Sequence, residues 1–417
     1  MRAIINSKNF YKVVGFVLAL STISSEAAAY GYYKCDGVAA RWPGSFNLFE
    51  VAMPMYASPT SFPAGPWREA LEKSFERLNA NPSKLRVAFK GYGASSTKSG
   101  DGVNKIWGNS SEEYWDYWAY AAAHTLLKLD CPDNPGNTIS FIKESDIVVN
   151  YLSDNIAHWT KSEIAANLGP YEEENASDWN GVPNSWDPPV QGKEAFGSTL
   201  LHELGHAAGL RHENRFYSVM GLPQSHLHAV GQYAYPYFGA DSAAGLLGLY
   251  GNGFVFPDLS VAHFKYDAPW YYLEEYSHHK KTMLFDDGPY GGNPVSSTLA
   301  FSEPWWAEYK TYRVDPGETV RVEFTYENLG YLAQKDIPVR FYVSSDNVIN
   351  SMDTKLGDAK LTVAGGGHFT AKVGIKMPYW LARDKNYWIG VYIDPFNSLV
   401  ERDENNNTSY LPVHTNE

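Results

Sequence analysis

The chain has 417 residues, which is enough for two or three domains of ordinary size. Hydrophobic residues make up 44% of the sequence, aromatic residues 15% and charged residues 19%, so the chain has the composition of a folded globular protein rather than a mainly disordered one. Asp and Glu number 47 against 34 Lys and Arg, which gives a net charge of −13. This negative charge opposes binding to phosphate backbones, and nucleic acid is therefore not an expected partner.

The first 29 residues have the pattern of a signal peptide for export. Basic residues lead into a mostly apolar run over residues 13–23, and three alanines at 27–29 form a small-residue cleavage site. The run is shorter than the roughly 20 apolar residues that a bilayer span needs, and no later segment is long and apolar enough. We therefore expect a secreted protein without a membrane span, located outside the cell or in the periplasm.

The sequence contains two cysteines, Cys35 and Cys131. In an oxidising compartment an even pair predicts one disulfide, which here would close a long loop. The alternative is a free Cys35 that binds a metal ion as a thiolate. We expect the disulfide.

Helical and strand patterns are mixed in the first part of the chain, residues 30–256. A helix is predicted over residues 66–79, where apolar residues recur at helical spacing after an opening proline. Alternating apolar residues predict a strand over 85–89. A second helix is predicted over 110–131, with an aromatic face in the core, and a short strand over 147–149.

From residue 257 onward the pattern consists almost purely of strands and turns. Three runs show alternating apolar and aromatic positions: Val320, Val322, Phe324 and Tyr326; Val339, Phe341 and Val343; and Trp388, Gly390 and Tyr392. Turns rich in Pro, Asn and Gly separate these runs, as in an antiparallel sandwich. We expect an all-β, immunoglobulin-like sandwich over residues 257–417, with an aromatic and Gly-rich insertion around 270–306.

The most informative stretch begins at His202 and reads HELGHAAGLRH, an HExxHxxGxxH motif. His202 and His206 are separated by about one helical turn, so both imidazoles can bind one cation. The helix is expected to begin near residues 196–198 and to end at Gly209, where a left-handed residue lets the chain turn sharply. This turn would bring His212 round as a third ligand. Zinc suits ligands of this type.

Three histidine ligands leave the fourth tetrahedral position of a zinc ion open for water, as in catalytic zinc sites. A bound zinc ion lowers the pKa of that water to about 7 and polarises a substrate carbonyl. Glu203 follows the first ligand and can take the proton of the water and pass it to the leaving amine. The motif therefore predicts hydrolysis of peptide bonds with one zinc ion, Zn2+, as cofactor.

The sequence around this motif resembles the metzincin clan of zinc peptidases, and within the clan the matrixins. Met220 follows His212 by eight residues and looks like the methionine turn, in which a methionine forms a hydrophobic floor beneath the zinc; ordinary core packing is the alternative. The stretch 240–251 resembles the matrixin closing helix, in which Asp241 would cap the helix or hold the methionine turn by hydrogen bonds. The resemblance implies an α+β catalytic domain, a mixed twisted sheet plus helices, over residues 30–256.

Two departures from the matrixin pattern concern the site and its metals. Ser242 stands where matrixins usually carry a second aspartate. The sequence also has no clear counterpart of the segment that holds their structural zinc and calcium. The resemblance therefore supports one catalytic zinc ion and leaves the additional metals without support.

The C-terminal part resembles CARDB, the cell-adhesion-related domain of bacteria, which is an immunoglobulin-like module. The matching segments are 257–259, 316–320, 327–330, 341–346 and 400–406. The family implies binding to a substrate or to a cell-surface or extracellular protein. The acidic end of the match, Glu401 to Glu404, is a candidate Ca2+ site, and a solvated loop is the alternative.

These observations together predict a secreted zinc metalloendopeptidase that acts on a protein or peptide substrate and carries a binding domain at its C-terminus. One alternative is an adhesin or binding protein whose zinc domain is vestigial, although Glu203 argues against it because a binding relic needs no base beside its metal. Another is a zinc hydrolase that acts on substrates other than peptides.

Overall fold

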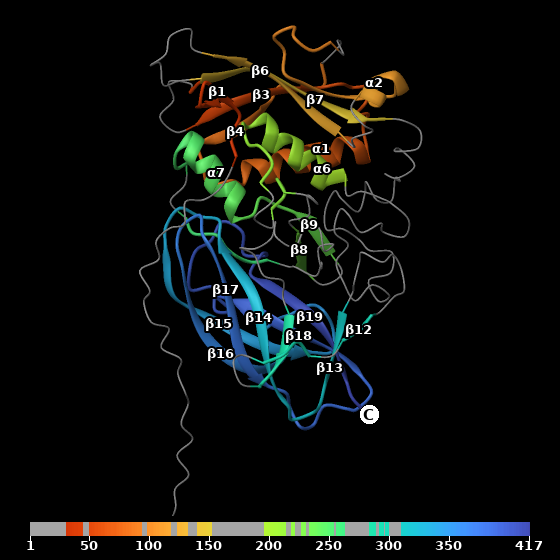
Figure 1. Ribbon diagram of the computed structural model, residues 1–417, viewed down its shortest axis with the longest axis vertical. Coiled ribbons are helices and arrows are strands. Elements are labelled where there is room, and N and C mark those ends of the chain that lie inside the picture. The colour runs from red at the N-terminus through yellow and green to blue at the C-terminus, as the bar shows by residue number, and fades with distance from the viewer. Residues whose placement is uncertain are drawn as a thin grey trace, which may run out of the picture.

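The structure is a computed structural model, which describes residues 31–44, 50–93, 98–117, 123–131, 140–151, 196–213, 218–221, 227–230, 233–253, 256–262, 283–288, 292–295, 297–299 and 310–417. The predicted signal peptide, and most of the predicted insertion around 270–306, lie outside these residues. Figure 1 shows two parts stacked along the long axis: a sheet with helices from the first half of the chain, and below them a β-sandwich from the C-terminal part.

Seven of the described strands form one mixed sheet in the N-terminal part. Its order is β1 (Lys34–Cys35), β2 (Val38–Arg41), β7 (Ser140–Asn150), β5 (Lys105–Asn109), β3 (Val51–Ala57) and β4 (Leu85–Phe89). The sixth strand in the chain, β6 (Ala123–Asp130), pairs antiparallel with β7, whereas the pairs β2·β7, β5·β7, β3·β5 and β3·β4 are parallel. The strand predicted over 85–89 is confirmed, and the one predicted over 147–149 is part of the longer β7.

Helices pack against one face of this sheet, on the side of the sandwich (Figure 1). They are α1 (Pro66–Asn79), α6 (Phe196–Ala207) and α7 (Ala240–Tyr250); the short α2 (Glu112–Tyr117) is separate from them. α1 has the predicted bounds and begins with a proline in its first turn, where the missing N–H costs nothing. Leu71 and Leu78 of α1 share a fully buried core with Leu200 and Leu204 of α6. This core fixes the position of α6 beneath the sheet.

The helix predicted over residues 110–131 is wrong in its second half. Among the described residues of this stretch the helix is α2, and Ala123–Asp130 forms β6, which pairs with β7 from Ala123 opposite Val149 to Asp130 opposite Phe141. Leu127 and Leu129 pack against the main core, whereas Leu126 packs on the opposite face against a cluster around Trp107, so the side chains follow the period of a strand. The pairing with β7, the next strand along the chain, decides this conformation.

The C-terminal part is a sandwich of two sheets. In one sheet β14 (Thr319–Asn328) pairs with β17 (His368–Lys376), β10 (Leu259–Val261) and β11 (Met283–Asp286). The other sheet has the order β12 (Ser297–Leu299), β13 (Lys310–Val314), β19 (Thr408–Thr415), β18 (Asn386–Ile393), β15 (Gln334–Ser344) and β16 (Thr354–Val363). The predicted all-β sandwich is confirmed.

The first two alternating runs have the predicted faces in the core between the sheets: Val320, Val322 and Phe324 are fully buried, as are Val339 and Phe341. The third run forms β18, but Ile389, Val391 and Ile393 face this core instead. Trp388 and Tyr392 pack on the other face with Tyr342, Ile349 and Tyr410. Both faces of β18 are apolar, so the alternation alone does not tell which face is inside.

Two further features complete the architecture. β8 (Leu227–Val230) and β9 (Tyr233–Pro236) form an antiparallel pair between α6 and the sandwich (Figure 1). Cys35 and Cys131 form a disulfide that joins β1 to the end of β6, so the predicted disulfide is confirmed and a free Cys35 is excluded. Within the described part of the chain, no helix combines the length and apolar character required to cross a bilayer.

Candidate metal centre

Helix α6 places the motif residues in the interior of the N-terminal part. His202, Glu203 and His206 are buried on it. The chain leaves the helix at Gly209, whose φ of +99° is the left-handed conformation predicted for this position. A Cβ at Gly209 would stand 2.9 Å from the carbonyl oxygen of Ala40, so glycine is required here both by conformation and by space.

The turn after α6 brings the third histidine to the other two. Nε2 of His212 lies 3.1 Å from Nε2 of His202 and 3.1 Å from Nε2 of His206. In the described residues, this trio is the one group of three or more His, Cys, Asp or Glu side chains whose candidate ligand atoms all lie within 4.8 Å of one another. His212 is exposed, so the trio is open to solvent on its side.

The hydrogen bonds of the two helical histidines fit a metal ion at this point. Nδ1 of His202 lies 2.7 Å from the carbonyl oxygen of Val219, and Nδ1 of His206 lies 2.8 Å from that of Leu210. A carbonyl only accepts, so each Nδ1 carries the proton and each Nε2 has a free lone pair. Nε2 of His212 faces both of these lone pairs, so a cation placed among the three nitrogens can be bound by all of them. The donor set therefore fits zinc, which takes imidazole nitrogen ligands.

Burial keeps the imidazoles in the neutral form that binds metals. It lowers the pKa of His206 to about 4 and lowers that of His202 well below its usual value, with the neighbouring histidines adding to the effect at His202.

Glu203 lies beside the trio with a hydroxyl partner that sequence reasoning missed. The Oγ1 of Thr125 lies 2.6 Å from Oε2 of Glu203 and 3.0 Å from its backbone oxygen. Burial raises the pKa of Glu203 to about 7, and the Thr125 hydroxyl acts in the lowering direction. Thr125 belongs to β6, in the stretch for which the sequence predicts a helix. The strand period of Leu127 and Leu129 is the signal that would have placed it.

Met220 packs against helix α6, and its role as a floor beneath a zinc ion stays a prediction. It is buried, and a Cβ on Gly205 would collide with its Sδ, so the sulfur packs directly against the backbone of α6 between the two helical histidines. The backbone N–H of Met220 donates to Oγ of Ser218 at 3.2 Å. Oγ of Ser218 in turn lies 2.6 Å from Oγ of Ser242 in the first turn of α7.

Asp241 is buried at the start of α7. The adjacent Ser242, at the position where the sequence departs from the matrixin pattern, contacts Ser218 in the turn at 218–221. Both roles considered for Asp241 therefore stay predictions.

The chain segment before β1 also lies against the site. The backbone N–H of Arg211 donates to the oxygen of Gly31 at 2.8 Å, and that of Tyr33 donates to the oxygen of Gly209 at 3.1 Å. The ring of Tyr33 meets the ring of His206 edge-on, with 5.9 Å between their centroids. These bonds hold the turn that carries the third histidine. The sequence near Tyr33 contains no signal of this contact, because its partners are about 175 residues away.

The candidate calcium segment in the C-terminal part is arranged differently. Oε2 of Glu401 accepts a hydrogen bond from the N–H of Leu259 at 2.9 Å, and Oε1 of Glu404 accepts one from the N–H of Glu401 at 3.0 Å. Burial raises the pKa of Glu401 to about 8 and that of the adjacent Asp258 to about 7. Calcium at this segment stays a prediction.

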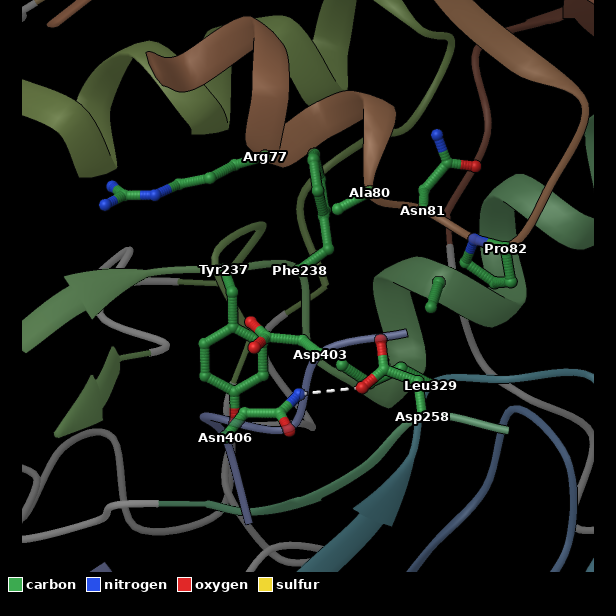
Figure 2. A pocket seen from close by; sticks show the side chains of 11 residues that line it. Arg77, Ala80, Asn81, Pro82, Tyr237, Phe238, Asp258, Leu329, Asp403 and Asn406 are labelled. Carbon is green, nitrogen blue, oxygen red and sulfur yellow. Dashed lines mark hydrogen bonds between the residues drawn. The ribbon is translucent and has the colours of Figure 1, made fainter. Parts of the chain in front are cut away.

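A small cavity lies between α1 and the sandwich, close to this segment. Figure 2 shows its lining, with Asp258 and Asn406 joined by a hydrogen bond of 2.8 Å on one side and Arg77 of α1 on the other. Its volume is about 70 Å³, whereas pockets for small organic ligands measure roughly 300 Å³ or more. This cavity has room for a few water molecules, and we do not consider it a substrate site.

Comparisons with known proteins agree with the C-terminal assignment. The family model CARDB matches residues 307–410, so this part of the chain is a CARDB domain. The chain is similar to the CARDB domain of a Pyrococcus furiosus protein determined in complex with di-metal ions, with 17% identity over 39% of this chain and 96% of that chain and a TM-score of 0.23. It is also similar to a Geobacter metallireducens protein, with 23% identity over 30% of this chain and 93% of that chain and a TM-score of 0.19. The search of curated proteins finds no match.

Proposed function

We propose that the protein is a secreted zinc metalloendopeptidase of the metzincin type, in which the CARDB domain binds the substrate or a cell surface. The observation that carries the proposal is the convergence of three imidazole Nε2 atoms, 3.1 Å apart in two of the pairs, beside a buried glutamate. The mixed sheet with helices in the N-terminal part agrees with the architecture that the metzincin resemblance implies.

In this proposal His202, His206 and His212 hold the zinc ion through Nε2, while the carbonyls of Val219 and Leu210 keep the first two rings in the required tautomer and orientation. A zinc ion bound there supplies a water of lowered pKa and polarises the substrate carbonyl.

Glu203 is the residue that moves the proton. The Thr125 hydroxyl donates to Oε2 and orients the carboxylate, and a remaining lone pair of this group accepts the proton from the attacking water. Glu203 then holds this proton and transfers it to the leaving amine nitrogen. In the metal-free chain burial raises the pKa of Glu203 to about 7, which favours its role as a proton acceptor.

The strand beside the site favours a peptide over other substrates. β6 pairs with β7 along one edge, and no other described strand pairs with it. Thr125 connects this strand directly to Glu203. An extended peptide can add to an open strand edge through main-chain hydrogen bonds, which places a scissile carbonyl next to the site. The disulfide between Cys35 and Cys131 agrees with export to an oxidising compartment.

The experiment is to incubate the full-length mature protein, loaded with zinc, with denatured protein substrates and to analyse the fragments. We expect cleavage that a chelator abolishes and that added zinc restores. Glu203→Gln should keep one zinc ion per chain and the native circular dichroism spectrum but lose activity by roughly 10³-fold, because the proton acceptor is gone. Glu112→Gln, an exposed substitution on α2, is the matched control and should retain full activity.

The alternatives give different results. If the wild-type protein binds zinc and adheres to a surface but cleaves no peptide, it is a binding protein with a vestigial zinc domain. Undiminished cleavage by Glu203→Gln removes the proposed mechanism. Chelator-sensitive hydrolysis of non-peptide esters or amides without peptide cleavage identifies a zinc hydrolase of another class.

A further inference from the structure

Helix α7 begins without a capping side chain of its own. The residue before it is Gly239, and no side-chain hydrogen bond from that residue caps the helix. Ala240, the first helical residue, is fully buried, so its N–H is shielded from water. Backbone N–H groups in the first turn of a helix have no partner within the helix, and a buried one needs an acceptor from elsewhere.

The CARDB domain supplies this acceptor. Glu327 on β14 is fully buried, and its Oε1 accepts a hydrogen bond from the N–H of Ala240 at 3.1 Å, across 87 residues of sequence. Its Oε2 accepts from the hydroxyl of Tyr237 at 3.2 Å and from that of Ser260 at 3.3 Å. A carboxylate at a helix N-terminus also interacts favourably with the helix dipole. Glu327 therefore contacts the first turn of α7 directly and holds Tyr237, which precedes the helix, through its other oxygen.

From this turn a short series of contacts leads to the histidines. Ser242, two residues after Ala240, lies 2.6 Å from the hydroxyl of Ser218, which accepts the backbone N–H of Met220. Val219 stands between Ser218 and Met220 in the chain, and its carbonyl orients the ring of His202. The turn at 218–221 is thus held by α7 on one side and contacts a histidine ring on the other.

We infer that Glu327 is a positioning residue for the histidine site: by fixing the first turn of α7 it holds the turn at 218–221, and with it the ring of His202. The CARDB domain then has a second role besides binding, because one of its buried side chains completes the support of a site in the other part of the chain. The inference rests on the proposed zinc site as far as it concerns metal affinity.

A second contact between the two parts provides a matched control. Arg402, also in the CARDB domain, donates from Nη2 to the carbonyl of Asn79 at 2.8 Å, at the C-terminal end of α1. A cation at a helix C-terminus is favourable in the same way as a carboxylate at an N-terminus. This carbonyl belongs to α1 rather than to α7 or the turn at 218–221. Arg402→Ala therefore weakens the contact between the two parts without removing the support of the turn.

The test measures hydrogen–deuterium exchange in the metal-free full chain, followed by the affinity for Zn2+ in competition with a chromogenic chelator. For Glu327→Ala we expect exchange in peptides that cover 218–221 and the start of α7 to rise, and Zn2+ affinity to fall, by about ten-fold each. Glu327→Gln retains an oxygen that can accept from Ala240 and should show the same changes at smaller size. Arg402→Ala should leave both quantities within about two-fold of the wild type.

Unchanged exchange at 218–221 in a folded Glu327→Ala protein overturns the inference, and so does an equal rise in Arg402→Ala. If Glu327→Ala does not fold, Glu327→Gln decides in the same way. If the wild type itself binds no Zn2+, the proposed function fails, whereas the exchange comparison in metal-free protein still decides whether Glu327 holds the turn.

Discussion

Within the part of the chain that the structure describes, two groups of side chains of the types that bind metal ions differ in how their polar atoms are used. One is the histidine site, formed by His202, His206 and His212. The other is the acidic cluster of Asp258, Glu401 and Glu404 in the C-terminal part. In the histidine site, backbone carbonyls bind the Nδ1 atoms of two rings, which leaves their Nε2 atoms free to converge. In the acidic cluster, backbone N–H groups bind carboxylate oxygens directly.

This difference shows that residue type alone does not make a metal site. An imidazole has two nitrogens, so the backbone can hold one while the other remains available to an ion. In the acidic cluster one oxygen of Glu401 and one of Asp258 join β10 to the loop at 401–407, whereas Oε1 of Glu401 and Oε2 of Glu404 have no hydrogen-bond partner among the described residues. The backbone thus directs the Nε2 atoms of the first group toward one point, whereas in the second group it joins two segments of the sandwich.

The largest expected effect concerns where zinc binds. His212→Ala removes one of three ligands and should lower the affinity for Zn2+ by roughly 10³-fold, about 4 kcal/mol, if the binding energy is shared among the ligands. Glu401→Gln should leave that affinity unchanged, because it alters only the acidic cluster. Chelator competition at equilibrium measures both. Tight zinc binding by His212→Ala would show that His212 is not a ligand. Loss of zinc binding in Glu401→Gln would show that the ion binds at the acidic cluster.

The next effect concerns the pH dependence of folding stability, which has opposite signs in the two regions. Glu401 and Asp258 have raised pKa values, about 8 and about 7, so the folded state binds more protons than the unfolded state between about pH 4.5 and 8. Their contribution to stability is complete at low pH and is lost as the pH rises through this window, by on the order of 3 kcal/mol for Glu401. Glu401→Gln should remove this loss.

The measurement is urea unfolding of metal-free protein at pH 5 and at pH 8, with Glu112→Gln as the exposed control. His206 acts in the other direction, since its pKa is lowered to about 4: its contribution is complete above about pH 6.5 and is lost as the pH falls toward 4. An identical pH dependence in the wild type and in Glu401→Gln contradicts the assignment of a raised pKa to Glu401.

The smallest effect concerns Thr125. Thr125→Val removes the hydroxyl that acts to lower the pKa of Glu203, so this pKa should rise and the acidic limb of the kcat/KM profile should move to higher pH. Activity at neutral pH should fall by about ten-fold, which corresponds to one hydrogen bond, with no change in zinc affinity. Thr370→Val, which removes a similar hydroxyl from the sandwich, is the control and should show no shift. A profile identical to that of the wild type contradicts the role given to Thr125.

Local patterns in the sequence predicted much of this protein correctly. The i, i+4 spacing of His202 and His206 and the glycine at 209 predicted a helix, a left-handed turn and the approach of a third histidine, because helix geometry and glycine conformation are local properties. Alternation of apolar residues in the C-terminal part predicted the strands of the sandwich, because the period of a strand is also a local property. With two cysteines in the chain, one pairing was available, and it is the one observed.

Contacts between distant segments decided the rest. Thr125 lies 78 residues before Glu203, and Glu327 lies 87 residues after Ala240, so no local pattern connects either pair. The strand at 123–130 exists because β7 offers it hydrogen-bond partners, and β18 turns its other face inward because the opposite sheet covers that side. Spacing along the chain thus determined which residues could meet at the site, whereas packing between elements decided which side chains hold them there, since a hydrogen bond depends on position in space rather than on distance in sequence.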